Sequence, residues 1–379
     1  MKKYLFIPLF LLCFNAYAGF EAIGASLNSP TQFDAFCQQN NGDWETCTDT
    51  TTALPGTYQH LFYSETTQES VAFGYYDNNQ GNSSFMAACK TRGENIWRNC
   101  TPDVTHIPAG NYDEYIRPAH DGNGRFMIVG DGENDSLIAA CRNANGSWYD
   151  CSPVQDTEDF SVDSFNYTNQ QWIALSRNDR WEDGYTIIPA LCMDHTASWQ
   201  NCDLSVIYRD SNDSFSGSSL QGIQYIPASR EWVGLHLGYI NGLDGLYLRS
   251  FCRKDRESVW DDCTNDIFSS NGATNLIQNE QGELLVFNLV FSGISLKTQI
   301  LCKKPNTGWR ECGENINLDN QIYYGATVNP DGKWVLIGND VSREQAYLTA
   351  VKEDDDFWRV TRQQPIDSGS TLMDIVFIP

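Results

Sequence analysis

Short apolar stretches alternate with polar turns along the whole chain, and no segment shows the 3.6-residue period of an amphipathic helix. Between residues 114 and 153 the pattern consists of EYIRPAH, RFMIVGD, SLIAACR and SWYDCSP, separated by DGNG, GEND and NANG. Stretches of this length, bounded by Gly, Asn and Asp, predict β-strands joined by tight turns. The order recurs elsewhere, for example as EWVGLH followed by LYLRSFC. The pattern therefore predicts an all-β chain built from four-stranded units.

A tryptophan marks the last hairpin of each unit and sets the period of the repeat. The intervals between successive tryptophans run from 49 to 61 residues. Repeats of about 50 residues with four strands each are typical of β-propeller blades. We therefore expect a seven-bladed β-propeller with four antiparallel strands per blade. The seven tryptophans are Trp44, Trp97, Trp148, Trp199, Trp260, Trp309 and Trp358.

The two ends of the chain complement each other. The last nine residues, TLMDIVFIP, resemble the first strand of the other units, whereas FEAIGASL near the N-terminus resembles a second strand. We expect the C-terminal strand to complete the first blade and to close the ring. Residues 19–379 then form one propeller domain.

Twelve of the 13 cysteines occur as pairs that flank the marked hairpins. Nine or ten residues separate the members of a pair, and the tryptophan lies three residues before the second cysteine. Facing positions on antiparallel strands suit a disulfide, whereas zinc sites favour spacings of two to four residues and often include histidine. The pattern predicts six disulfides: Cys37–Cys47, Cys89–Cys100, Cys141–Cys151, Cys192–Cys202, Cys252–Cys263 and Cys302–Cys312.

The first 18 residues have the three parts of a secretory signal peptide. Two lysines precede an apolar run over residues 4–14, and Ala-Tyr-Ala ends at Ala18. We expect cleavage after Ala18 and a secreted or periplasmic protein. Cys13 raises the alternative of a lipoprotein signal, but two leucines fill the positions where small residues are expected. No later stretch predicts a membrane helix, so we expect no membrane insertion.

The formal net charge of −24 limits the partners that the chain can bind. Affinity for nucleic acid or an anionic membrane depends on cationic contacts, so neither is expected as a partner. Alternating oxygen ligands in a loop suit calcium, and Asp131, Glu133 and Asp135 form such a run without the terminal glutamate of a full calcium loop. Calcium is the one cofactor that the sequence raises, and otherwise none is expected.

The hairpin NANGSW at 143–148, like QNNGDW at 39–44, resembles the Asp box of sialidase-like propellers. That box has the pattern Ser-x-Asp-x-Gly-x-Thr-Trp and occupies the hairpin between the third and fourth strands of a blade. Here the glycine lies one place nearer the tryptophan, the serine is absent, and cysteines flank the hairpin. The resemblance implies the propeller fold, and it carries over no catalytic residue.

Two features depart from the repeat and predict a ligand-binding face. Residues 203–219 contain an insertion of roughly eight or nine residues by comparison with the other units, and Trp181 falls in a predicted loop. Both segments belong to connections that emerge on one face of a propeller, where function is commonly placed. Trp181 with Tyr208, Asp210 and Asp213 would offer a stacking surface and polar partners. The alternative is that Trp181 packs beneath a neighbouring loop.

No nucleophile elbow, HExxH motif, phosphate loop or dinucleotide fingerprint occurs in the sequence. We therefore expect a non-enzymatic binding propeller for a glycan or an extracellular protein. The alternative is a secreted polysaccharide hydrolase or lyase with acidic residues at the channel mouth. A purely structural surface protein is a third hypothesis. The oligomeric state is not indicated by the sequence.

Overall fold

The structure is a computed structural model, and the predicted signal peptide, residues 1–18, lies outside the residues that it describes. The described residues are 19–26, 33–38, 44–47, 54, 57–77, 83–94, 96–102, 107–112, 118–154, 157, 159–178, 180–182, 185–194, 198–209, 215–240, 245–255, 257–264, 268–270, 272–273, 276–292, 295–316, 320–340, 346–353, 357–365 and 370–379.

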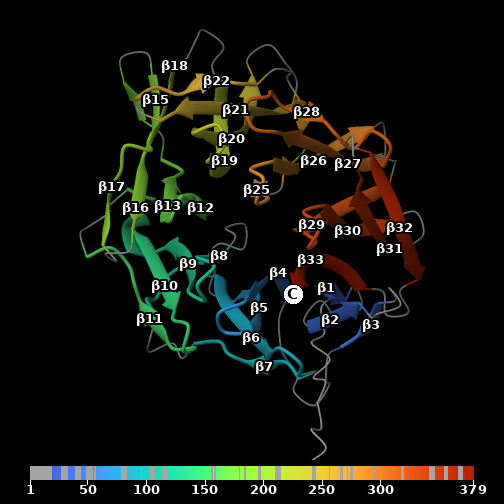
Figure 1. The fold of residues 1–379 in the computed structure, drawn as a ribbon. Helices are drawn as coiled ribbons and strands as arrows, with labels where there is room; N and C mark the ends of the chain where they lie inside the picture. The colour runs from blue at the N-terminus through green and yellow to red at the C-terminus, as the bar shows by residue number, and fades with distance from the viewer. Residues whose placement is uncertain are drawn as a thin grey trace, which may run out of the picture.

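Seven antiparallel sheets surround a central axis, as Figure 1 shows, which confirms the predicted seven-bladed propeller. From the axis outward, the first blade consists of β33 (Ser370–Ile378), β1 (Gly19–Ser26), β2 (Phe33–Gln38) and β3 (Trp44–Thr46). The second consists of β4 (Thr57–Ser64), β5 (Glu69–Asp77), β6 (Ser83–Thr91) and β7 (Arg98–Asn99). The third consists of β8 (Ala119–His120), β9 (Phe126–Asp131), β10 (Leu137–Arg142) and β11 (Trp148–Asp150). A single 3-10 turn, η1 (Glu133–Asp135), joins β9 to β10.

The remaining four blades have the same order. The fourth blade consists of β12 (Val162–Thr168), β13 (Gln171–Ser176), β16 (Ala190–Met193) and β17 (Trp199–Asn201), and the fifth of β19 (Phe215–Ile226), β20 (Glu231–Ile240), β21 (Leu246–Lys254) and β22 (Asp261–Asp262), with β23 (Phe268–Ser270) beside β21. In the sixth, β24 (Gly272–Ala273) and β25 (Ile277–Gln278) are innermost, followed by β26 (Leu284–Ser292), β27 (Ser295–Lys303) and β28 (Arg310–Glu311). The seventh consists of β29 (Gln321–Val328), β30 (Trp334–Asp340), β31 (Ala346–Lys352) and β32 (Trp358–Pro365). The fourth blade adds a three-stranded sheet of β14 (Arg180–Glu182), β15 (Tyr185–Ile188) and β18 (Val206–Arg209).

The ring closes as the sequence predicts. Strand β33 pairs with β1 in antiparallel fashion from Gly19 opposite Ile378 to Ser26 opposite Ser370. The C-terminal strand is therefore the innermost strand of the first blade. Closure matters because each blade has two apolar faces, and only a closed ring gives every face a neighbour.

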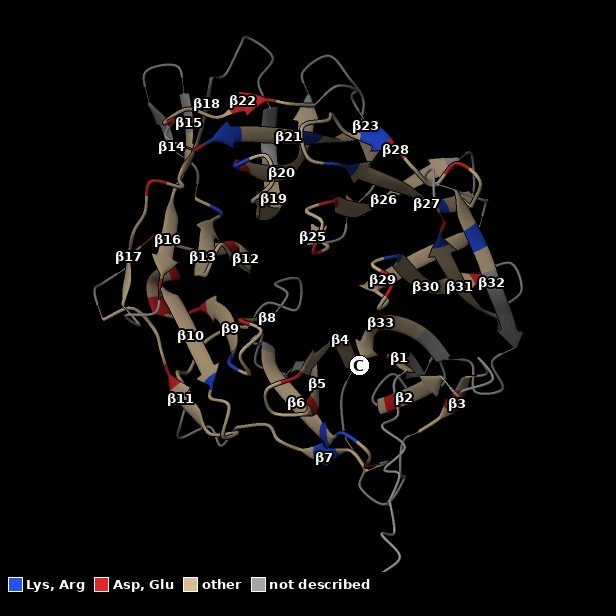
Figure 2. Cartoon of the chain, in the orientation of Figure 1, with Lys and Arg blue, Asp and Glu red and all other residues tan. Residues whose placement is uncertain are grey.

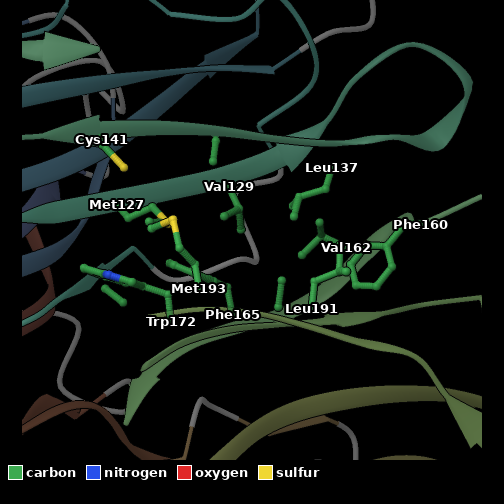
Figure 3. Close-up of a cluster of buried hydrophobic side chains, with 13 residues drawn as sticks. Met127, Val129, Leu137, Cys141, Phe160, Val162, Phe165, Trp172, Leu191 and Met193 are labelled. Carbon is green, nitrogen blue, oxygen red and sulfur yellow. The ribbon is translucent and has the colours of Figure 1, made fainter. Parts of the chain in front are cut away.

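The core is divided among the junctions between neighbouring blades. Each of the seven junctions in the described part of the chain contains one cluster of buried apolar side chains. Figure 3 shows the cluster in which Met127 and Val129 of the third blade meet Val162, Trp172 and Leu191 of the fourth. Packing of adjacent sheets, face against face, therefore holds the propeller together.

All six predicted disulfides are present. Each joins the third strand of a blade to the residue just beyond the short fourth strand, with Cα–Cα distances from 5.6 to 5.8 Å. The distances lie in the ordinary range for a disulfide across an antiparallel pair. Each bridge therefore fixes the outermost strand, which has a free edge.

At four junctions a hairpin tryptophan connects its blade to the blade before it. The indole Nε1 donates a hydrogen bond to a backbone carbonyl of the preceding blade, and in three cases that carbonyl belongs to the second cysteine of a disulfide. The bonds are Trp148 to Cys100 at 3.0 Å, Trp199 to Cys151 at 2.8 Å, Trp358 to Cys312 at 2.6 Å and Trp260 to Ser205 at 3.2 Å. The sequence motif of Cys and Trp is therefore an inter-blade contact as well as a hairpin.

Four junctions also contain a buried ion pair. In each, the cation follows the first cysteine position of one blade, and the glutamate belongs to the second strand of the preceding blade or to the residue just before it. The pairs are Lys90 with Glu21, Arg142 with Glu69 at 2.8 Å, Lys303 with Glu231 at 3.1 Å and Lys352 with Glu283. Breaking one partner of such a pair leaves an uncompensated buried charge, which is strongly destabilising.

Deletion of residues 371–379 should prevent cooperative folding. The deletion removes Leu372, Ile375 and Ile378, each at most 3% exposed. Burial of each side chain contributes roughly 1.5–3 kcal/mol, so together they approach the total stability of a typical domain. Calorimetric melting of a chain ending at Ser370 measures this. A melting transition equal to that of the full chain would show that ring closure is dispensable.

The Trp358→Phe substitution should lower the melting temperature by several degrees. It removes the indole N–H, leaves the carbonyl of Cys312 without that donor, and costs about 1–3 kcal/mol. Trp172→Phe is the matched control, because it removes similar ring atoms from a core tryptophan that stacks on Phe165 at 5.9 Å. An equal loss in the two variants would mean that ring packing, and not the hydrogen bond, matters at Trp358.

Candidate functional site

A cavity of about 240 Å³ lies among the innermost strands of five successive blades. Because these strands belong to the second to sixth blades, the cavity lies on the channel axis and not between two blades. Its wall combines aromatic, aliphatic and carboxamide side chains. The lining residues are Phe62, Pro118, Ala119, His120, Phe165, Asn166, Tyr167, Gln221, Gly222, Gln224, Leu276, Ile277 and Gln278.

Strand register places one lining residue per blade at the same height in the ring. Asn166 pairs with Ile173 on the second strand, which in turn pairs with Cys192 on the third. The equivalent position in the other four blades is also opposite the first cysteine of that blade. These positions are occupied by Phe62, Ala119, Gln224 and Ile277. The disulfide repeat therefore marks the height of the cavity wall.

Five inner strands carry a β-bulge three residues before this height. The extra residue has no partner on the second strand, and a bulge redirects side chains by bending its strand. The extra residues are Gln59, Asp163, Gln221, Tyr324 and Met373. In the fifth blade the bulge brings Gln221 and Gly222 into the cavity wall.

Gly222 lets the fifth blade approach the sixth closely at the cavity wall. Its φ of 151° belongs to the region that residues other than glycine rarely adopt. A Cβ at this position would lie only 3.1 Å from the Cβ of Leu276, which is buried between the two blades. A larger residue at 222 would therefore strain β19 and push the two parts of the wall apart.

Three carboxamides of the wall are held by bonds between blades. The side-chain N–H groups of Asn166, Gln224 and Gln278 donate to the backbone oxygens of Ile223, Leu276 and Tyr225, at 3.1, 3.4 and 2.8 Å. Asn166 Oδ1 also accepts the backbone N–H of Tyr167 at 2.8 Å. A carboxamide offers two N–H donors and an acceptor oxygen, so these contacts fix the orientation of each group while using part of its capacity.

The imidazole of His120 is oriented by its own turn. Its Nδ1 accepts the backbone N–H of Gly122 at 3.2 Å, so the proton of the neutral ring is on Nε2. The ring lies edge-on to Phe62, with the centroids 5.2 Å apart. Burial raises the pKa of the nearby Tyr167, and the carboxylate of Asp121 raises it further. Tyr167 therefore stays a neutral hydroxyl that can donate and accept hydrogen bonds.

The residues of the predicted site at Trp181 lie in strands and not in loops, as far as the structure describes them. Trp181 was expected in a loop, but it lies in strand β14, and Tyr208 lies in β18. Both are opposite Thr186 of β15, so the two segments meet in the small sheet on the outer part of the fourth blade in Figure 1. Asp210 and Asp213 lie outside the described residues. Ligand binding by this sheet stays a prediction.

The cavity lies nearer the opposite end of the channel. Its lining residues come from the parts of the inner strands that precede the turns into the second strands, for example Asn166 in β12 and Gln278 in β25. The sheet with Trp181 instead follows the second strand of its blade. The two candidate regions are therefore distinct, and sequence reasoning missed the cavity. Aligning the first strands of the units on the cysteines would have revealed polar residues at 166 and 224.

Asp131 contributes to packing between blades. Its Oδ1 accepts the backbone N–H of Val162 at 2.7 Å, and its Oδ2 accepts the hydroxyl of Ser161 at 3.0 Å. Glu133 and Asp135 lie exposed in η1. Within the described residues, no group of three His, Cys, Asp or Glu side chains is arranged to hold a metal ion. Calcium binding by residues 131, 133 and 135 stays a prediction.

Comparisons with solved structures give matches that extend over most of the chain. A putative 6-phosphogluconolactonase from Bacteroides uniformis matches with a TM-score of 0.58 and 12% identity, over 95% of this chain and 99% of that one. A lectin from Burkholderia pseudomallei has a TM-score of 0.49 and 12% identity, over 90% and 98% of the two chains. An ulvan lyase has a TM-score of 0.48 and 8% identity, over 96% and 97%. At 12% identity the likeness to the first of these structures shows the fold alone.

No protein-family model and no curated protein matches this sequence. The sialidase-like character of the hairpins therefore stays a resemblance in sequence. The part of the chain that the structure describes contains no apolar helix of bilayer-spanning length. The six disulfides indicate folding in an oxidising compartment.

Substitution of Asp131 by Ala should lower the melting temperature equally in calcium and in a chelator. The loss of two hydrogen bonds to β12 costs about 1–3 kcal/mol by the general scale for buried polar groups. Glu133→Ala is the control, because an exposed side chain outside this contact should leave the melting temperature unchanged. If the chelator lowered the melting temperature of the wild type, and both substitutions removed that response, calcium would be the ligand of these residues.

Proposed function

We propose that this protein is an exported, non-enzymatic propeller that binds a glycan in the cavity on its channel axis. The observation that carries the proposal is the wall itself, which contains both fixed carboxamides and aromatic rings. A sugar presents hydroxyls that donate and accept, together with an apolar face of C–H groups. Carboxamides satisfy the hydroxyls, and aromatic rings cover the apolar face. The wall thus combines both kinds of contact within one small volume.

Fixed orientation of the carboxamides supports binding. Ordering a flexible side chain on binding costs about 0.5–1.5 kcal/mol, so groups that are already held by the fold lose less free energy. Asn166 is held at both ends of its amide, and Gln278 is tied to the fifth blade. The hydrogen bonds between blades therefore stabilise the propeller and also hold the carboxamides in position for a ligand.

The acid–base alternative has less support at this site. Glycoside hydrolysis generally uses a pair of carboxylates that flank the bond. Among the described lining residues of the cavity, none is Asp or Glu. A polysaccharide hydrolase or lyase remains the competing function, and a protein ligand is the competing partner. Both are distinguishable outcomes of the experiment below.

A glycan array tests the proposal, with the mature protein applied in calcium and in chelator and with soluble products monitored by mass spectrometry. Gln278→Leu should reduce binding of the recognised glycan at least about tenfold, which corresponds to roughly 1.4 kcal/mol. Gln200→Leu is the matched control, because Gln200 is exposed on β17 and does not line the cavity.

Three results would contradict the proposal. Release of shortened or unsaturated products would show an enzyme. Binding that Gln278→Leu and Gln200→Leu leave equally intact would place the site elsewhere, with the sheet of Trp181 as the next region to test. Absence of binding to every glycan on the array would remove the glycan hypothesis.

A further inference from the structure

We infer that the cavity selects one uncharged sugar residue at the end of a glycan, and that it rejects internal residues and acidic sugars. This inference rests on the proposed function and concerns the same cavity. It follows from three properties of the wall, namely its enclosure, its volume and its charge.

Enclosure limits how a glycan can enter. The wall is formed by the inner strands of five of the seven blades at one height, as the shared register shows. A groove that runs across a protein surface lets a polymer lie through it with both ends outside. A space on the channel axis that is bounded by the inner strands of five blades opens along that axis. A branched or linear glycan therefore reaches it with a terminal residue.

Volume limits how much of the glycan fits. The cavity measures about 240 Å³. Pockets that take drug-sized ligands measure about 300–1,000 Å³. The cavity is smaller than these pockets, which suits a single sugar ring better than several linked rings. Gly222 helps to keep the wall in this shape, because it lets the fifth blade pack closely against Leu276 of the sixth.

Charge limits which sugar is accepted. The described lining contains no Lys, Arg, Asp or Glu. Burial of a carboxylate without a cationic partner costs several kcal/mol, and the net charge of −24 adds repulsion at long range. Figure 2 shows the charged residues distributed around the ring and not gathered in one sheet. Uronic and sialic acids should therefore be excluded, whereas neutral hexoses and N-acetylhexosamines are accepted.

The test compares glycans that carry the same neutral sugar in three settings: terminal, internal, and terminal but capped by sialic acid. Free neutral hexoses and N-acetylhexosamines are titrated in parallel with the corresponding uronic acids by calorimetry. The terminal display should bind, and the capped and internal displays should be at least tenfold weaker. The neutral monosaccharide should compete for the site, and its uronic acid should be at least tenfold weaker.

Two substitutions that alter the cavity wall provide a second measurement. Gly222→Ala should reduce binding at least tenfold, and Gly234→Ala is its control, because a Cβ at Gly234 meets Trp260 at an ordinary 3.7 Å. Ile277→Phe fills the space from β25 and keeps the inference testable if the strain at Gly222 impairs folding. Melting curves identify any variant that fails to fold.

Each result supports or overturns a defined statement. Binding of capped or internal residues as tight as that of terminal ones overturns end recognition, and equal binding of the uronic acid overturns the charge argument; glycan binding itself then stands. If Gly222→Ala and Ile277→Phe both fold and bind normally, the ligand is not in this cavity. If no glycan binds, the proposed function fails, and this inference fails with it.

Discussion

The hairpin clamped by a disulfide and followed by an inter-blade indole bond is the contact on which the rest of the propeller depends. The disulfide fixes a fourth strand of only two or three residues against the third strand. The carbonyl of its second cysteine then accepts the indole N–H of the next blade, as in Trp148 with Cys100. Without the bridge that carbonyl would belong to a fraying edge. At three junctions the disulfide and the tryptophan of the next blade therefore give each other a fixed partner.

The seventh blade shows what replaces the bridge when the cysteines are absent. Its fourth strand, β32, is eight residues long and pairs with β31 over its whole length. Val351 occupies the first cysteine position, and Trp358 still donates to Cys312 of the preceding blade. Longer backbone pairing thus holds this edge. The indole contact is retained because it serves the junction and not only the hairpin.

The buried ion pairs also connect neighbouring blades, and the junctions that lack such a pair show how the charges are replaced. Arg125 and Lys333 occupy positions where other blades place the glutamate, and the cation positions opposite them in the next blade hold Met193 and Gln38. The two cations pair instead with Asp121 and Glu353 of their own blades. At these two junctions the glutamate and the cation are both replaced. Between the fourth and fifth blades only the glutamate is replaced, by Gln171, and the buried Arg253 donates instead to the backbone oxygen of Asp203. An apolar cluster is sufficient at the two junctions where both are replaced, and charge pairing is an addition to packing.

The sequence by itself determined the fold to a large degree, because the information was repeated. Strand length, turn residues and the spacing of Cys and Trp recur in each unit, so errors in one unit are corrected by the others. Closure by residues 371–379 followed from their likeness to other first strands, and all six cysteine pairs followed from their place in one hairpin.

Only the tertiary structure decided where a ligand could bind. The cavity wall combines single residues from strands as far apart in sequence as Phe62 and Gln278, and no local pattern links them. The same holds for Asp131, whose loop suggested calcium, although its partners Ser161 and Val162 lie on the next blade. Trp181 was expected in a loop because its strand has only three residues; it forms a hairpin with β15, and β15 pairs in turn with β18, some twenty positions further on. Local sequence specifies strands and hairpins, whereas contacts across blade junctions depend on register and ring closure, which no single unit contains.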